Sequence, residues 1–138
     1  MPAWLTRFMR LLAAAPKPTR EALLNDGLEL AMDWGENWLA PIQERLRQRH
    51  SHLPADELDE LNAASQEAMK FGHETAYQLV RAKGKNIDEN EFLQLVLAKY
   101  AWLSAENKAR LFRQSMYYAW KAGGSVREAA APEASTPT

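Results

Sequence analysis

The chain has 138 residues, of which 46% are hydrophobic and 25% are charged, a composition typical of a single soluble globular domain. Its net charge of −1 at pH 7 argues against a nucleic acid as partner. The absence of cysteine excludes disulfides, thiol catalysis and thiolate zinc sites, and it favours a cytoplasmic location. The five tryptophans are many for this length, and tryptophan is enriched at binding surfaces.

The first predicted helix is short and amphipathic, and it covers residues 3–15. Trp4 and Phe8 lie on its apolar face, with Arg7 and Arg10 on the other side. These arginines interrupt the apolar run that a secretory signal requires, so we do not expect a cleaved signal. We expect the segment to fold back as an outer helix of the bundle. The alternative is that this basic amphipathic helix binds a membrane surface.

The next pattern predicts a helix from Arg20 to Ala40, with Thr19 as its N-cap. Its apolar face includes Trp34 and Trp38, and Pro41 kinks or ends the helix. A row of acids lies on the opposite face: Asp26, Glu29, Asp33 and Glu36. We expect these acids to be solvated, and the alternative is that they bind a basic partner.

Two further helices are predicted before residue 84. In the first, residues 42–50, Ile42 and Leu46 face inward and three arginines face outward: Arg45, Arg47 and Arg49. The second runs from Pro54 to about Lys83, and Gly84 stops it. Its inward seam is close to a heptad repeat: Leu58, Leu61, Ser65, Ala68, Gly72, Ala76 and Leu79.

Small residues predict close packing of the helices over residues 20–40 and 54–83. Gly27, Ala31 and Gly35 are spaced four apart, and the second helix has its own row of small residues. Glycine inside a helix costs about 1 kcal/mol relative to alanine, so close backbone approach would compensate for it. We expect the two helices to pack antiparallel along these seams. The alternative is a ligand pocket between them, beneath Trp34 and Trp38.

The most apolar stretch is Phe92 to Leu103, which we expect at the centre of the bundle with the other helices around it. Lys99 interrupts this stretch, and we expect its ammonium group to reach water or a carboxylate. Ser104 is a predicted N-cap for a helix over residues 105–122. The glycines at 123 and 124 are predicted to end that helix, and residues 125–138 have the composition of a disordered tail.

The chain carries no recognisable catalytic or metal-binding motif. A di-iron bundle needs Glu-x-x-His pairs, but the residues three positions before the histidines are basic: Arg47, Arg49 and Lys70. We expect His73 to be a hydrogen-bonded residue at the boundary of the core. No catalytic residue, metal or cofactor is predicted.

The predicted helix over residues 105–122 carries cations and aromatics along one side: Arg110, Arg113, Tyr117 and Lys121, with Trp120 nearby. Such interleaving can bind phosphates and stack bases. Three cations are few for that role in a chain with abundant acids. The alternative is that they pair with the acidic row of residues 26–36.

The sequence therefore predicts an all-α protein. We expect a compact bundle of about five helices over residues 1–124, with a short N-terminal amphipathic helix and a disordered C-terminal tail at 125–138. The function predicted is a non-enzymatic interaction or adaptor protein that binds a protein partner or forms a homo-oligomer. Candidate binding residues are Trp4, Phe8, Trp34, Trp38, Arg110, Arg113, Tyr117, Trp120 and Lys121.

Two alternatives stay open. One is a peripheral membrane protein anchored by the N-terminal helix, and the other is a small-ligand binder or enzyme with a pocket between the helices of residues 20–40 and 54–83.

Overall fold

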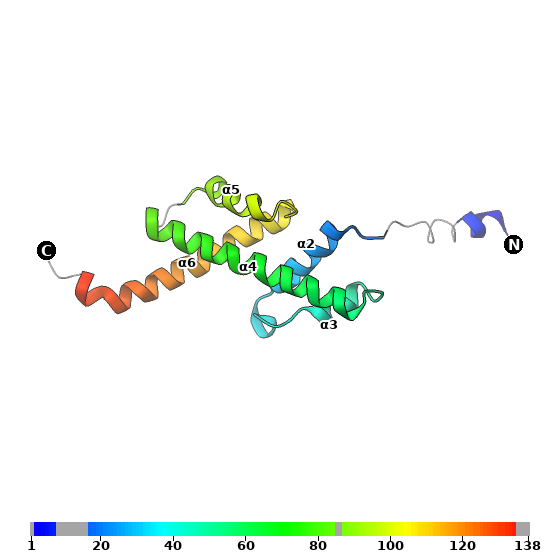
Figure 1. Cartoon of the computed structure of the whole chain (residues 1–138), viewed down its shortest axis with the longest axis horizontal. Coiled ribbons are helices and arrows are strands. Elements are labelled where there is room, and N and C mark those ends of the chain that lie inside the picture. The colour runs from blue at the N-terminus through cyan, green and yellow to red at the C-terminus, as the bar shows by residue number, and fades with distance from the viewer. Residues whose placement is uncertain (1, 8–16, 85–86, 135–138) are drawn as a thin grey trace.

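The computed structural model describes residues 2–7, 17–84 and 87–134, with side-chain positions as far as residue 122. Within these residues every regular element is helical and there is no strand. The elements are α2 (Arg20–Ala31), the short 3-10 helix η1 (Gly35–Asn37), α3 (Gln43–Arg49), α4 (Ala55–Lys83), α5 (Glu89–Lys99) and α6 (Ala105–Ala134) (Figure 1). The predicted all-α bundle is therefore confirmed.

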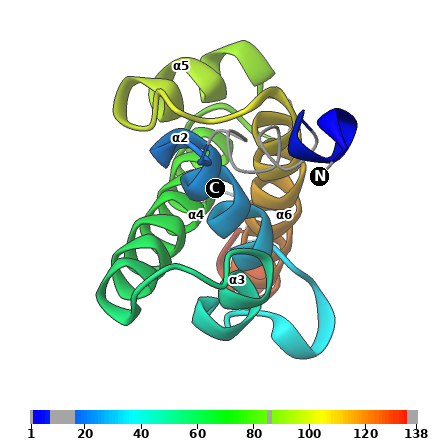
Figure 2. The ribbon, with the colours of Figure 1, turned by 90° about the vertical axis from the view of Figure 1, so that its right-hand side faces the viewer.

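Helix α4 contacts each of the other helices from α2 to α6. It packs most extensively on α6, and it also contacts α2, α3 and α5. Viewed end-on, α2 lies between α4 and α6, with α5 across one side of the bundle and α3 across the other (Figure 2). The predicted seam of α4 is buried throughout: Leu58, Leu61, Ser65, Ala68, Gly72, Ala76 and Leu79.

The prediction that residues 92–103 form the centre of the bundle is wrong. Helix α5 packs on α4 and α6 at the periphery. Phe92 and Val96 are fully buried, but Leu95 is 47% exposed. The small residues of α4 let neighbouring helices approach it closely from several sides, and the larger side chains of α5 do not.

The expectation for Lys99 is confirmed. Its ammonium lies 3.4 Å from a carboxylate oxygen of Glu67, and 4.9 Å from the ring centre of Phe71. The side chain therefore covers apolar surface with its stem while its charge stays near solvent.

Helix α2 begins as predicted, with the Thr19 hydroxyl accepting from the Ala22 amide at 3.0 Å, but it ends well before Ala40. The guanidinium of Arg45 donates to the Leu30 carbonyl at 2.9 Å. The amide of Gln114 donates to the Met32 carbonyl, also at 2.9 Å. These side chains replace the backbone N–H groups that a continuing helix would supply.

The loop between α2 and α3 is consequently a separate element. Gly35 has a φ of 83°, in the left-handed region that favours glycine. Arg45, predicted to face outward, instead holds the loop, because its guanidinium bonds Asp33 at 2.9 Å and the Ala40 carbonyl at 3.4 Å. Ile42 and Leu46 are fully buried, as predicted.

The predicted close packing of α2 on α4 is confirmed at Gly27 and fails at Gly35. A Cβ atom on Gly27 would lie 2.5 Å from the Ser65 hydroxyl oxygen and 3.2 Å from an Ile42 methyl. Gly35 lies in the exposed loop instead. The contact at Gly27 leaves no space for a ligand between α2 and α4 there.

A polar network that the sequence did not predict joins α2 to the beginning of α6. The Asn25 side chain donates to the Trp102 carbonyl and accepts from the Ser104 amide, both at 2.8 Å. The Asn107 side chain donates to both oxygens of Asn25 at 2.9 Å. Ser104 is the predicted N-cap, since its hydroxyl accepts from the Asn107 amide at 3.2 Å.

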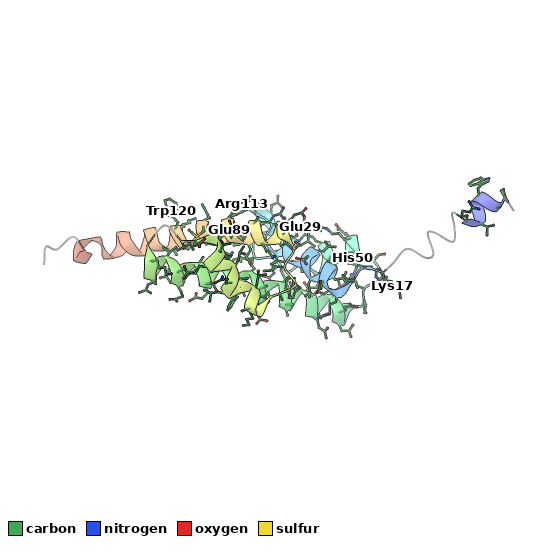
Figure 3. The ribbon with its side chains drawn as sticks, turned by 90° about the horizontal axis from the view of Figure 1, so that it is seen from above. Lys17, Glu29, His50, Glu89, Arg113 and Trp120 are labelled. Atoms are coloured by element: carbon green, nitrogen blue, oxygen red, sulfur yellow. The ribbon has the colours of Figure 1, made fainter. Side chains whose placement is uncertain are left out.

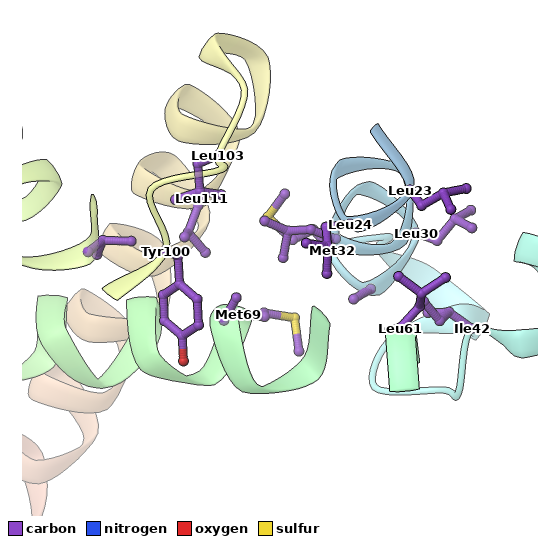
Figure 4. Close-up of a cluster of buried hydrophobic side chains, with 14 of the residues drawn as sticks. Leu23, Leu24, Leu30, Met32, Ile42, Leu61, Met69, Tyr100, Leu103 and Leu111 are labelled. Atoms are coloured by element: carbon purple, nitrogen blue, oxygen red, sulfur yellow. The ribbon is translucent and has the colours of Figure 1, made fainter. Parts of the chain in front are cut away.

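The hydrophobic core fills the space between these helices. Figure 4 shows side chains from α2, such as Met32, and from the beginning of α6, such as Leu111, converging on α4 near Met69. All three of these residues are almost completely buried. The core therefore fixes the position of α6 along α4.

The two ends of the chain differ from expectation where the structure describes them. Helix α6 continues past the glycines at 123 and 124 to Ala134, in a segment rich in alanine, the strongest helix former. Trp4, in the helical residues 3–7, is 68% exposed and so is not packed on the bundle. Residues 8–16 and 135–138 lie outside the described residues. Disorder therefore stays a prediction for 135–138, whereas residues 125–134 of the predicted tail are helical. Among the helices that the structure describes, none combines the length and apolarity needed to span a membrane.

Candidate functional site

The early end of α2 brings two tryptophans onto α6. Trp34 and Trp38 stack on each other and on Tyr118, with ring centres 5.0–5.6 Å apart and planes within 18° of parallel. Tyr117 meets Trp34 edge-on, with ring centres 5.5 Å apart. Each such aromatic pair contributes about 0.5–1.5 kcal/mol beyond the area that it buries. We refer to these four rings and His73 as the aromatic cluster.

His73 of α4 packs against two rings of the aromatic cluster. Its ring centre lies 5.0 Å from that of Tyr118 and 5.9 Å from that of Trp38. Its Nε2 is 2.9 Å from Gln114 Oε1. Because the Gln114 amide nitrogen donates to the Met32 carbonyl, Oε1 accepts from His73, so the proton of the neutral imidazole is on Nε2. The expected hydrogen-bonded boundary histidine is therefore confirmed.

Burial lowers the pKa of His73 below 6.5, although the hydrogen bond to Gln114 opposes the shift, so the ring is neutral at pH 7. Burial and the neighbouring Tyr117 raise the pKa of Tyr118 above 10.0, which keeps that phenol neutral as well. Neither His73 nor Tyr118 therefore carries a charge at neutral pH. These contacts indicate a structural role for His73. Its Nε2 proton is hydrogen-bonded to Gln114, and its ring packs against Trp38 and Tyr118.

The predicted acidic row is largely paired inside the molecule. Asp26 lies 2.7 Å from His50, and Asp33 lies 2.9 Å from Arg45. Glu29 lies 3.3 Å from Arg49 and 3.9 Å from Arg110. These three acids still keep 35–41% of their side-chain surface exposed, as expected of a solvated row. The alternative pairing with α6 occurs at Arg110.

An exposed face of α6 lies beside the aromatic cluster. Trp120 is 57% exposed, Tyr117 45%, and the adjoining Trp34 54%. Together with Arg113 we call these residues the α6 outer face. Figure 3 shows Arg113 and Trp120 along the same edge of the molecule as Glu29. The sequence named all four residues as candidates, and the structure brings them together.

A shallow hollow opens on this face. Its volume is about 340 Å³, and it is lined by Val80 of α4 and by Arg113, Met116, Tyr117 and Trp120 of α6. Lys121 flanks it, with its ammonium 5.9 Å from the Tyr117 ring centre. Neither Arg113 nor Lys121 pairs with a carboxylate among the residues with described side chains. The hollow therefore combines aromatic walls with two available cations.

The other candidates are not part of this group of four residues. Trp38 is mostly covered within the aromatic cluster, and Arg110 is engaged with Glu29. Trp4 is exposed in the N-terminal residues, and Phe8 lies outside the described residues. A second hollow of about 470 Å³ runs beside His73 along α4 and α6. In the described part of the chain no group of three or more histidines and acids is arranged to hold a metal ion.

Two residues of the cluster, Tyr118 and His73, were missed as site residues, and so was Gln114, which hydrogen-bonds His73. The adjacent tyrosines of α6 hinted at an aromatic surface, but the partners of Tyr118 come from a loop that the sequence pattern assigned to a helix. No protein-family model, curated protein or solved structure matches this chain. The function is therefore argued from the geometry alone.

Proposed function

We propose that this protein is a non-enzymatic interaction protein that binds a protein partner, or a second copy of itself, through the α6 outer face. The observation that carries the proposal is the exposure of three adjoining aromatic side chains, Trp34, Tyr117 and Trp120, at 45–57%. Buried tryptophan, tyrosine and arginine side chains dominate the binding energy of protein interfaces. The α6 outer face groups four residues of these types. Their exposure to solvent contributes nothing to folding, which is consistent with a role in binding.

The internal structure supports a rigid surface. Trp34 is held between Trp38, Tyr118 and Tyr117, so its indole is already oriented before a partner arrives. Preorganised side chains lose less conformational entropy on binding. The cysteine-free composition favours a cytoplasmic site of action, which stays a prediction.

Cross-linking in cells followed by affinity capture tests the proposal. The triple variant Trp34→Ala, Tyr117→Ala, Trp120→Ala is compared with wild type and with Leu95→Ala, which removes an equally exposed apolar side chain from α5. We expect cross-linked partners, or cross-linked copies of the chain, in the wild type and the Leu95 control, and their loss in the triple variant. The same cross-linked species at the same yield in all three would contradict the proposal.

A second candidate function is favoured by one observation, the 68% exposure of Trp4. An exposed tryptophan on a basic amphipathic segment is suited to a membrane interface. We infer that residues 3–15 would then anchor the protein to anionic lipid. Co-sedimentation with liposomes of phosphatidylserine and phosphatidylcholine, with and without that segment, tests it; equal pelleting of both proteins would rule it out.

A further inference from the structure

The geometry points to a second copy of this chain as the partner of the α6 outer face. We propose an isologous dimer in which the two α6 helices cross antiparallel about a two-fold axis at Tyr117. This inference rests on the proposed function, because it names the partner for the same surface.

The exposed residues of α6 form a continuous stripe. They are spaced alternately four and three apart along the helix: Glu106, Arg110, Arg113, Tyr117 and Trp120. This is the spacing with which one helix packs along another. The opposite face of α6 is already occupied by α4. Within the described residues Arg110 pairs with Glu29 and Tyr117 contacts Trp34, but Tyr117 and Trp120 remain 45% and 57% exposed, so much of the stripe is available to a second helix.

The stripe is complementary to itself only in the antiparallel direction. Arg113 lies about 6 Å before Tyr117 along the helix axis, and Trp120 lies about 4.5 Å after it. In an antiparallel pair centred on Tyr117, each Arg113 therefore meets the Trp120 of the other copy. A guanidinium over an indole is a favourable cation–π pair. A parallel pair would instead place Arg113 against Arg113, where like charges repel.

The hollow beside the stripe provides room for the incoming indole. It measures about 340 Å³ and is bordered by Arg113 itself, with Val80 and Met116 behind. In the antiparallel pair centred on Tyr117, the Trp120 of the second copy lies over Arg113. The same alignment places its indole at the hollow that Arg113 lines.

The course of α6 agrees with this pairing. Figures 1 and 3 show the helix continuing beyond the end of α4, and it reaches Ala134. A short helix without tertiary contacts is only marginally stable in water. In the antiparallel dimer the first part of the other copy's α6 runs alongside this projecting segment. The net charge of −1 per chain sets up little repulsion between two copies.

The main rival is an acidic partner, since Arg113 and Lys121 would also attract carboxylates. Sedimentation equilibrium of the full-length wild type separates the two. We expect a reversible dimer that Trp120→Ala weakens at least about thirty-fold, as for a hot-spot tryptophan. Leu95→Ala, the exposed apolar control on α5, should leave the dimer unchanged, and circular dichroism checks that each variant is folded.

Single cysteines test the direction of the helices, because the natural chain has none. Tyr117→Cys lies on the proposed axis and should form a disulfide-linked dimer on mild oxidation. Arg110→Cys should not, because two turns from the axis the equivalent residues of an antiparallel pair are about 21 Å apart. Efficient cross-linking of both variants would indicate a parallel pair and overturn the inference.

The possible outcomes distinguish a failure of the proposed dimer from a failure of the proposed binding function. A wild type that is monomeric up to millimolar concentration, or a dimer that Leu95→Ala weakens and Trp120→Ala does not, overturns the self-association. If such a monomer binds a polyglutamate peptide and Trp120→Ala abolishes that binding, the partner is acidic. In that case the dimer is wrong, while the proposed function of the α6 outer face stands.

Discussion

Each of the two faces of α6 departs in part from what is expected of a surface helix. The inner face, packed on α4, is built partly from small or polar residues, including Gln114, Ser115 and Ala119, all nearly completely buried. The outer face exposes large aromatics, Tyr117 and Trp120. An amphipathic helix that served the fold alone would bury its aromatics and expose its polar residues. The difference indicates that the inner face is shaped for close packing and the outer face for binding.

The largest effect is expected from opening the inner face. Leu111 is fully buried, and its side chain fills the space above Gly72. Leu111→Ala should lower the free energy of unfolding by about 2–5 kcal/mol, the range for a leucine truncated in a core. Urea denaturation measures this loss. The exposed Leu95→Ala should change stability by no more than about 0.5 kcal/mol; similar losses in both would mean that α6 is not docked as described.

A somewhat smaller effect is expected from Gly72. A Cβ atom there would lie 2.8–2.9 Å from three carbon atoms of Leu111. Gly72→Ala should therefore destabilise the protein by about 1–3 kcal/mol, although alanine is the better helix former by about 1 kcal/mol. The same change in a Leu111→Ala background has room for the methyl and should be neutral or stabilising. A double-mutant cycle with no coupling between the two positions would contradict the contact.

The aromatic cluster, at the boundary of the two faces, should respond to pH. The folded-state pKa of His73 lies below 6.5, so between that value and 6.5 the unfolded chain binds more protons than the folded chain. The free energy of unfolding contributed by His73 is therefore complete above about pH 6.5 and falls as the pH drops through that window. Stability curves from pH 7.5 to 5 should be flatter for His73→Gln than for wild type. A His73→Gln variant with the same slope as wild type would refute the burial of His73.

The smallest effect on folding is expected at the outer face. At protein concentrations low enough to keep the chain monomeric, Trp120→Ala should change the free energy of unfolding by no more than about 0.5 kcal/mol. Trp38→Ala, which removes a ring stacked on Tyr118, should cost more. Fluorescence-monitored unfolding compares the two variants. A larger loss for Trp120→Ala than for Trp38→Ala would place the outer face in the fold and weaken the case for a binding role.

The sequence predicted the fold class and most helix limits because these depend on local features. The heptad-like seam of α4 and the caps at Thr19 and Ser104 all appear as expected. The centre of the bundle was wrongly assigned to residues 92–103. A high content of apolar residues indicates that a helix is buried, but it does not show how closely neighbouring helices can pack against it. Side-chain volume decides that, and α4 has the small residues.

The candidate site was predicted in part. Trp34 was predicted on the apolar face of residues 20–40, and Tyr117 and Trp120 on one side of residues 105–122. The structure brings the three together and leaves them exposed. Their arrangement depends on the early end of α2, which Arg45 and Gln114 enforce from positions far along the chain. No local pattern contains that information, so the stack on Tyr118 and the bond to His73 could not be predicted.

Amide hydrogen exchange along α6, recorded at a low and a high protein concentration, tests the central claim most directly. The account predicts that α6 amides from residue 113 onward exchange more slowly at high concentration, because self-association protects the outer face and the segment beyond α4. Amides of α5 should exchange at the same rate in both samples. Exchange that is independent of concentration throughout α6, or slowing on α5 instead, would contradict the account.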